Sequence, residues 1–228
     1  MKKLSGLFLL LSLLLVSCNA QKSSTAAKKP NKSGVEKIAD YIADKNYDQY
    51  SVATFAGGCF WCTEASFERI KGVIDVISGY SGGEIEYPTY YQVADGRTKH
   101  AESIQIYFDP EVISYQTLLE IFFTAHDPTT LNRQGPDKGP QYRSEIFYHG
   151  DEQKDLAQKY MAKLTKESAF ADPIVTKLNA YQEFWTAEDY HQDFYVNNPL
   201  QPYIVAVSRP KVKKVEAKFR DLLKEEYK

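Results

Sequence analysis

The chain has 228 residues, of which 43% are hydrophobic and 25% are charged, as in an ordinary globular protein with one substantial core. Its formal net charge of −2 argues against nucleic acid as the main partner, because nucleic-acid-binding domains are usually strongly basic. It contains only three cysteines, and a domain of this size does not need a disulfide framework.

The first 17 residues have the pattern of a signal peptide. Two lysines at 2–3 precede an apolar run at 4–16, which is shorter than the roughly 20 residues that span a bilayer. The run ends in Leu-Val-Ser-Cys at 15–18, which resembles the bacterial lipobox. We therefore expect Cys18 to carry lipid and to become the first mature residue. An ordinary cleaved signal that happens to hold a cysteine is the alternative.

Residues 18–48 are expected to form a lipidated flexible tether. The stretch at 19–34 is small, polar and basic and has no apolar period, which is typical of a linker. Val35, Ile38 and Ile42 are spaced as on a short amphipathic helix that packs on the domain.

Residues 49–210 are predicted to form a single catalytic domain, followed by a C-terminal helix within 211–228. Strand patterns occur at 51–56, 73–78, 104–108 and 143–148, with a weaker one at 174–178. Helical patterns occur at 60–70, 115–125, 153–166 and 212–226. Gly79–Gly83 is expected to be a loop, and the long connections at 79–100 and 127–142 are functional candidates.

The order of these elements predicts the fold class. Strands and helices intermix without the repeating strand–helix alternation of a doubly wound parallel sheet. We expect an α+β fold, a two-layer sandwich around a mixed, mainly antiparallel sheet.

Cys59 and Cys62 form the most informative local motif. Cys59 follows Gly57 and Gly58 at a strand end and opens a helix, where unpaired N–H groups and the helix dipole favour negative charge. This position predicts a lowered pKa for the Cys59 thiol. The two glycines would let backbone and substrate approach closely. Residues three apart on a helix have Cα atoms about 5 Å apart, a distance that a disulfide tolerates. Cys59 can therefore react, and Cys62 can resolve it.

Three other interpretations of the pair compete. A zinc site needs two more ligands at suitable spacing, and the four histidines are isolated in the sequence, so no metal site is predicted. A thioredoxin-like oxidoreductase shares the cysteine spacing, but the intervening Phe60 and Trp61 are bulky. Two inert cysteines in a core helix are the third option, and the preceding glycines count against it.

Residues 57–64, GGCFWCTE, resemble the signature of the A-type peptide methionine sulfoxide reductases, whose diagnostic core is Gly-Cys-Phe-Trp. Further blocks resemble the family in the family's order. They are Pro88-Thr89-Tyr90, His100-Ala101-Glu102, Tyr107 with Asp109-Pro110, His126-Asp127-Pro128, residues 133–144 and residues 187–195. The resemblance covers roughly residues 50–210, which is essentially the whole predicted domain.

The resemblance implies roles for four residues around the reacting atoms. Cys59 is similar to the family nucleophile, and Glu102 resembles the acid that protonates the sulfoxide oxygen. Phe60 and Trp61 resemble the walls of the pocket for the substrate methyl group. A carboxyl group among aromatic rings should have a raised pKa, so Glu102 could carry a proton at neutral pH.

Tyr90 and Tyr142 resemble the hydroxyls that share the sulfoxide oxygen, and Asp137 resembles the supporting acid. Taken singly, none of these three residues would stand out from ordinary core or turn residues. The chain departs from the family at Lys99, where glycine is frequent, and at 94–95. These departures put the shape of the loop in doubt more than the chemistry.

The resemblance implies reduction of methionine S-sulfoxide, free or in proteins, through a Cys59 sulfenic acid and a Cys59–Cys62 disulfide. Many relatives have resolving cysteines near the C-terminus; none occurs here, so Cys62 is the only candidate within the domain. No metal or organic cofactor is expected, only an external reductant such as thioredoxin. The protein is expected to be a monomer, anchored through Cys18 in the bacterial cell envelope with its domain outside the cytoplasm. A disulfide oxidoreductase and a non-catalytic lipoprotein that captures oxidised peptides remain alternatives.

Overall fold

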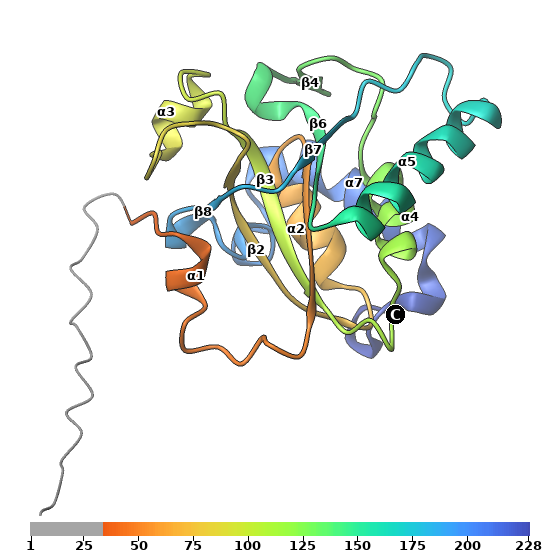
Figure 1. Ribbon diagram of the computed structural model, residues 1–228, viewed down its shortest axis with the longest axis horizontal. Helices are drawn as coiled ribbons and strands as arrows, with labels where there is room; N and C mark the ends of the chain where they lie inside the picture. Colours follow the sequence, from red (N-terminus) through yellow and green to blue (C-terminus); the bar gives the residue numbers. More distant parts are fainter. Residues whose placement is uncertain (1–33) are drawn as a thin grey trace, which may run out of the picture. The chain divides into compact units, whose positions relative to one another are not determined.

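Six strands form one mixed sheet at the centre of residues 34–228, the part of the chain that this computed structural model describes (Figure 1). Their spatial order is β7-β6-β1-β3-β2-β8, and every neighbouring pair is antiparallel except β6 and β7. The strands are β1 (Ser51–Gly57), β2 (Val73–Ser81), β3 (Ala101–Phe108), β6 (Ser144–Tyr148), β7 (Lys177–Ala180) and β8 (Phe184–Thr186). The α+β fold around a mixed, mainly antiparallel sheet is thus confirmed.

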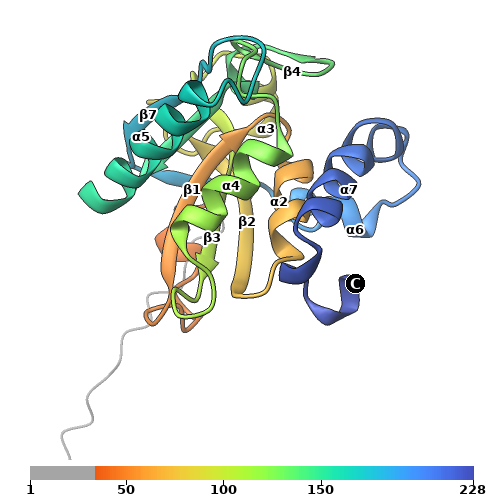
Figure 2. The same cartoon turned by 90° about the vertical axis from the view of Figure 1, so that its right-hand side faces the viewer.

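Helices α2 (Phe60–Glu68) and α4 (Tyr115–Ala125) cover one face of the sheet, and α7 (Arg209–Lys218) packs against both of them (Figures 1 and 2). Helix α5 (Asp151–Lys166) packs against α4 and the β6–β7 edge. The short helix α1 (Ile38–Tyr41) contacts β8. These helices and strands therefore form the two packed layers expected from the sequence.

Shorter elements connect the layers. They are α3 (Tyr90–Ala94), the two-stranded β4 (Arg133–Gln134) and β5 (Asp137–Lys138), the 3-10 helices Pro140–Tyr142 and Asp189–His191, α6 (Phe194–Asn197), the π-helix Ile204–Ser208, and the 3-10 helices Arg220–Leu222 and Glu225–Tyr227. Within residues 34–228, none of the helices combines the length and the apolar composition needed to cross a membrane.

The main core lies between the sheet and the helices α2 and α4, and residues of α7 join it from the outer side. Phe55 of β1 is fully buried and stacks on Phe122 of α4, with ring centroids 4.8 Å apart. All of β3 is buried, and its alternate residues Ile104 and Ile106 join this core. Because side chains alternate along a strand, Glu102 faces the same helical layer. Tyr107 faces the other way and packs in a smaller cluster with residues of the N-terminal segment.

The structure corrects the prediction at Gly79–Gly83. Strand β2 continues to Ser81 instead of ending in a loop at Gly79. A Cβ at Gly79 would lie 2.3 Å from the Phe184 ring and from the Trp185 carbonyl, so this glycine allows β8 to pack closely. Gly79 was thus interpreted as part of a turn, whereas it lies within β2 and allows close contact with β8.

Other element boundaries also moved. The weak strand pattern at 174–178 corresponds to β7 at Lys177–Ala180, and β8 was missed. The final helix ends at Lys218, eight residues before the predicted 226, and continues as 3-10 turns. The expected helix at 35–48 is only α1, with Val35 and Ile38 buried against the domain. The predicted signal peptide, Cys18 and the tether up to 33 lie outside the described residues.

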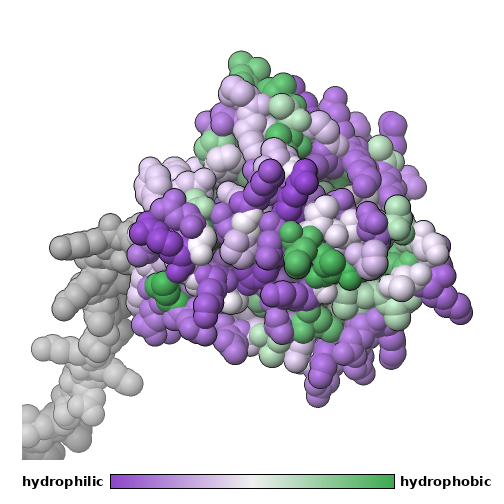
Figure 3. Space-filling model, turned by 90° about the horizontal axis from the view of Figure 1, so that it is seen from above, coloured by the Kyte–Doolittle hydropathy of each residue, from purple (hydrophilic) through white to green (hydrophobic). Residues whose placement is uncertain are grey.

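The surface offers no broad apolar area on the face in Figure 3. Hydrophobic side chains form small separate patches among hydrophilic ones there. The most exposed large hydrophobic residues, such as Leu200, Tyr91 and Leu131, are common on protein surfaces when scattered.

Lys99, one of the departures from the family pattern, occupies a left-handed backbone conformation with φ of 59°. Its carbonyl accepts a hydrogen bond of 3.1 Å from Arg143. A side chain with a Cβ pays about 1–2 kcal/mol in this region, whereas glycine does not. The loop thus retains a shape suited to glycine although lysine stands there.

We expect Lys99→Gly to be at least as stable as the unaltered protein. It should be more stable than Lys99→Ala by roughly 0.5–1 kcal/mol, the reverse of the usual order, because only glycine relieves the strain. Urea denaturation of the two variants measures the difference. A glycine variant less stable than the alanine variant would contradict the strained backbone.

Candidate active site

The glycines before Cys59 are required by local packing. Gly58 has φ of +91°, and a Cβ on it would lie 2.4 Å from the side chain of Gln134. A Cβ on Gly57 would lie 3.0 Å from the Phe122 ring, so this position is crowded as well. The close approach that the structure shows at Gly58 is to Gln134, and the approach of a substrate to these glycines stays a prediction. They place Cys59 as the N-cap residue of α2, next to β1 and β3.

A cavity of about 220 Å³ opens at this helix start. It is small enough to suit one side chain and is walled largely by aromatic rings. The lining residues are Cys59, Phe60, Trp61, Tyr90, Glu102, Asp137, Tyr142, Gln201 and Tyr203. The structure thus brings together every site residue predicted within the domain except Cys62.

Glu102 is the buried acid of the cavity. Its side chain is 3% exposed, and its Oε2 accepts a 3.1 Å hydrogen bond from the Phe60 backbone N–H at the first turn of α2. Burial raises the pKa of Glu102 to about 8, and the neighbouring Asp137 adds to the rise. Glu102 therefore carries a proton at neutral pH, as predicted.

The two cysteines are both free and buried. The Cys62 N–H donates to the Cys59 carbonyl at 3.2 Å, which ties them into one turn, and the Cys62 thiol donates to Ser208 Oγ at 3.1 Å. Cys62 lies behind Cys59 and does not line the cavity. Only Cys59 is thus placed to meet a molecule in the pocket.

The predicted lowering of the Cys59 pKa is wrong. Burial, the Cys62 thiol and Glu102 raise the pKa of Cys59, and this outweighs its position at a helix start. The hydrogen bond from the Cys59 thiol lowers the pKa of Cys62 to about 7. The two thiols titrate as a pair, so the first negative charge is shared between them.

Trp61 is held in position by residues to which the sequence had assigned no role. Its indole Nε1 donates to His191 Nδ1 at 3.2 Å, and its ring stacks on Phe194 with centroids 3.8 Å apart. Burial lowers the pKa of His191 to about 4, so the ring is neutral and can accept. The segment around residues 191–194 therefore fixes one wall of the cavity.

Tyr90 is positioned from the same region of the chain. Glu188 accepts the Tyr90 backbone N–H at 3.0 Å and the Tyr80 hydroxyl at 2.9 Å, which links the start of α3 to β2. Burial and then Glu102 raise the pKa of both Tyr90 and Tyr142. Both phenols therefore stay protonated and can donate hydrogen bonds into the cavity.

Tyr203 and Gln201 complete the lining and were missed from the sequence. The Tyr203 hydroxyl hydrogen-bonds to Asp137 and also lies within reach of the Cys59 thiol, whose pKa it lowers. These residues follow a turn-rich stretch with prolines at 199 and 202, which carries no signal for catalysis. Only the folded chain shows that this stretch returns to the cavity.

The histidines weighed as zinc ligands serve the fold. His126 is bound at 2.7 Å both to the Phe122 carbonyl and to Ser144 Oγ. Gly83 donates to His100 Nδ1 at 3.1 Å. Among residues 34–228, no group of three or more histidine, cysteine or acidic side chains is arranged to hold a metal ion.

Comparison with known proteins adds an independent finding. The sequence model of the peptide methionine sulfoxide reductase family matches residues 51–223. Peptide methionine sulfoxide reductase MsrA 1 of Rhodopirellula baltica is 56% identical over 173 residues, which cover 76% of this chain and 89% of that protein. The MsrA of Sulfolobus acidocaldarius is 55% identical over 170 residues, covering 75% and 96%.

Solved structures give the same picture. Reduced Mxr1 from Saccharomyces cerevisiae superposes with a TM-score of 0.60 at 38% identity and covers 67% of this chain and 87% of that one. Methionine sulfoxide reductase A of Corynebacterium diphtheriae gives 0.59 at 31% identity, covering 67% and 77%.

The burial of Glu102 predicts a stability effect that depends on pH. The folded state holds this proton up to pH about 8, whereas the unfolded chain releases it near 4.5, so wild-type stability falls as pH rises between these values. Glu102→Gln removes this loss. We expect the variant to gain stability relative to wild type across pH 4.5–8, reaching on the order of 4–5 kcal/mol. Urea unfolding at several pH values measures the gap, and a gap independent of pH would contradict the buried proton.

Proposed function

The chain belongs to the peptide methionine sulfoxide reductase family, and we propose that it reduces the S epimer of methionine sulfoxide with Cys59 as nucleophile. It is an oxidoreductase that reduces methionine sulfoxide to methionine at the expense of thiols. The observation that carries the residue assignment is that Cys59 and a protonated Glu102 line the same small aromatic cavity.

The chemistry requires an acid beside a thiolate. A sulfoxide sulfur becomes electrophilic when its oxygen is protonated, and Glu102 supplies that proton while Tyr90 and Tyr142 donate hydrogen bonds to the oxygen. Cys59 gives two electrons to the substrate sulfur and takes its oxygen, which yields methionine and a Cys59 sulfenic acid. Phe60 and Trp61 pack against the substrate methyl group and keep water from the reacting atoms.

The charge states of the two groups are linked. An ionised Glu102 opposes the Cys59 thiolate, since it raises the pKa of that thiol. A protonated Glu102 removes this repulsion and is at the same time the form that can donate. In the reactive state Glu102 is therefore neutral and the pair of thiols holds one negative charge, which Cys59 carries when it attacks, and the reaction slows as pH rises through the Glu102 pKa of about 8.

Cys62 then resolves the sulfenic acid. It condenses with Cys59 to form a disulfide, and water leaves. The turn that joins the two cysteines supports this step, as does the absence of other cysteines in the domain. An external dithiol of the thioredoxin type restores both thiols, and no metal or organic cofactor takes part.

Single-turnover reduction of the separated S and R epimers of a methionine sulfoxide peptide tests the assignment. The pre-reduced full-length protein should release one equivalent of methionine from the S epimer only and lose two thiols. Methionine from neither epimer would refute the proposal and favour disulfide exchange as the function.

Three variants serve as matched controls for this experiment. Cys59→Ser should release nothing. Cys62→Ser should release one equivalent and then stall with a thioredoxin-type reductant. Glu102→Gln should lose sulfoxide reduction yet keep thiol–disulfide exchange, which separates a reductase from a disulfide oxidoreductase.

We also propose that Cys18 anchors the protein by lipid in the bacterial cell envelope, with the domain outside the cytoplasm. The signal-like residues 1–17, the lipobox-like 15–18 and the polar stretch that follows support this location.

Lipid anchoring is tested by Cys18→Ala. In bacteria that express the full chain, wild-type protein should sediment with membranes and incorporate labelled palmitate. The variant should lose the label and appear in the soluble fraction, because the lipid on Cys18 is proposed to attach the protein to the membrane. Equal membrane association of both proteins, without label in either, would reject the anchor.

A further inference from the structure

The environment of Cys62 is built mainly by one continuous helix near the C-terminus. The π-helix Ile204–Ser208 runs directly into α7, and Ser208 at the junction is fully buried. Its hydroxyl accepts the 3.1 Å hydrogen bond from the Cys62 thiol and can donate to the same sulfur once it is ionised. A π-turn widens the helix locally and often occurs at functional sites.

Lys211 follows Ser208 by three residues, so it lies on the same face of this helix, one turn further along. Its Nζ is buried, and no atom of residues 34–228 forms a hydrogen bond with it. A buried ammonium group without a partner is costly. Asp127 and Asp172 line the same cavity as Lys211 without forming a hydrogen bond with it, so an anion that forms beside Lys211 during the protein's cycle would supply the missing partner.

The groups that act on the Cys62 sulfur identify this anion. Among the strongest electrostatic influences between Cys62 and its neighbours, all but one come from groups that become negative when they ionise: Cys59, Glu102, Asp137 and Tyr203. The exception is Lys211. The Cys59 thiol first, and then the Lys211 charge, lower the pKa of Cys62 to about 7. Lys211 is thus the cation that favours a Cys62 thiolate in an otherwise acidic site.

We propose that Lys211 is a positioning residue that stabilises the Cys62 thiolate during closure of the Cys59–Cys62 disulfide, an inference that rests on the proposed function. The Cys62 thiolate attacks the sulfur of the Cys59 sulfenic acid. The S–S bond forms with the thiolate electron pair, the S–O bond breaks, and hydroxide leaves as water with a proton from Glu102, which solvent has reprotonated. Ser208 and Lys211 stabilise the negative charge on the Cys62 sulfur before it attacks.

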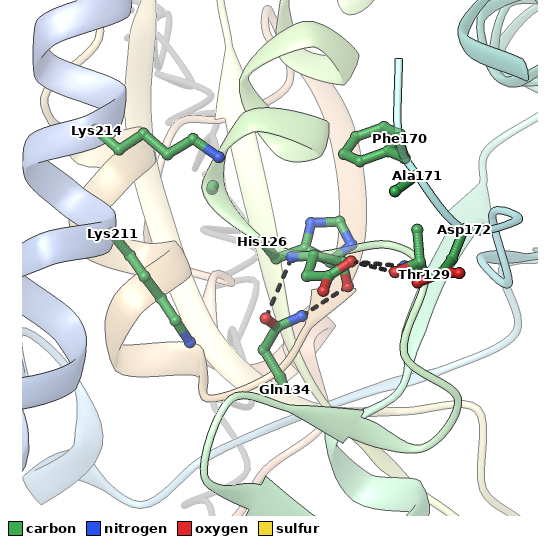
Figure 4. A pocket seen from close by; sticks show the side chains of 10 residues that line it. His126, Thr129, Gln134, Phe170, Ala171, Asp172, Lys211 and Lys214 are labelled. Atoms are coloured by element: carbon green, nitrogen blue, oxygen red, sulfur yellow. Dashed lines mark hydrogen bonds between the residues drawn. The ribbon is translucent and has the colours of Figure 1, made fainter. Parts of the chain in front are cut away.

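Lys214 provides a matched control. Both lysines leave α7 toward a cavity of about 440 Å³, separate from the catalytic one, that is also lined by His126 and Gln134 (Figure 4). Lys214 is one turn beyond Lys211, is exposed, and is not among the main influences on the Cys62 pKa. The two lysines lie on the same helix, carry the same charge and line the same cavity, but only Lys211 is among the main influences on the Cys62 pKa.

The test uses pre-reduced full-length protein with one equivalent of S-sulfoxide peptide at pH 6 to 9. Methionine release and dimedone-trapped Cys59 sulfenic acid are followed in parallel. In Lys211→Met, disulfide closure should lag behind methionine release, so that sulfenic acid accumulates. The pH midpoint of closure should rise by about one unit, with a several-fold loss of rate at pH 6.5 that shrinks as pH increases.

Lys211→Arg keeps the charge and should restore most of the closure rate, while Lys214→Met should behave as the wild type. Closure in Lys211→Met with the wild-type pH profile would overturn the inference. A loss of rate that is equal at every pH would also overturn it, because a purely structural role predicts that result. No methionine even from the wild type would overturn the proposed function, and the inference with it.

Discussion

The placement of a buried carboxyl group and a buried thiol in one largely aromatic cavity is the constraint on which the site depends. Neither Glu102 nor Cys59 can ionise easily there, and each opposes the charge of the other. Together, Glu102 and Cys59 therefore tolerate one negative charge, and a neutral acid beside an ionised thiol is the state that can reduce a sulfoxide. The fold maintains this state through β3, which points Glu102 at the first turn of α2. Burial destabilises the carboxylate, and this is the reason that Glu102 still holds a proton to donate at neutral pH.

The segment after β8 completes the site around this pair. His191 and Phe194 fix the indole of Trp61, Glu188 fixes the start of α3, and Tyr203 contacts both Asp137 and the thiol. These contacts join positions that are more than 60 residues apart in the chain. The catalytic motif at the start of α2 is therefore incomplete without the last 40 residues of the sequence. Rigid walls of this kind hold a substrate in a reactive orientation.

Sequence reasoning succeeded where the local pattern matched the tertiary environment. The apolar residues of 115–125 repeat with a helical period, and this range forms α4 with the predicted bounds. The strand predicted at 51–56 forms β1, which ends one residue later. It failed where distant contacts decide. Gly79 was placed in a loop because its close contact with β8 cannot be read locally, and Tyr203 gave no signal because its role depends on a distant return of the chain. The Cys59 pKa was misjudged for the same reason: the helix start is visible in the sequence, and the burial that outweighs it is not.

The location of both cysteines on one helical turn has a consequence for the order of events. Cys62 is buried behind Cys59, so the sulfur that a reductant can reach is the one that meets the substrate. Substrate and reductant must then use the same opening in alternation, and methionine has to leave before the disulfide is accessible. High concentrations of sulfoxide would in that case compete with the reductant for the oxidised enzyme. A resolving cysteine on a remote, mobile tail would let the reductant bind away from the substrate pocket. Here the substrate and the reductant use the same opening, one after the other.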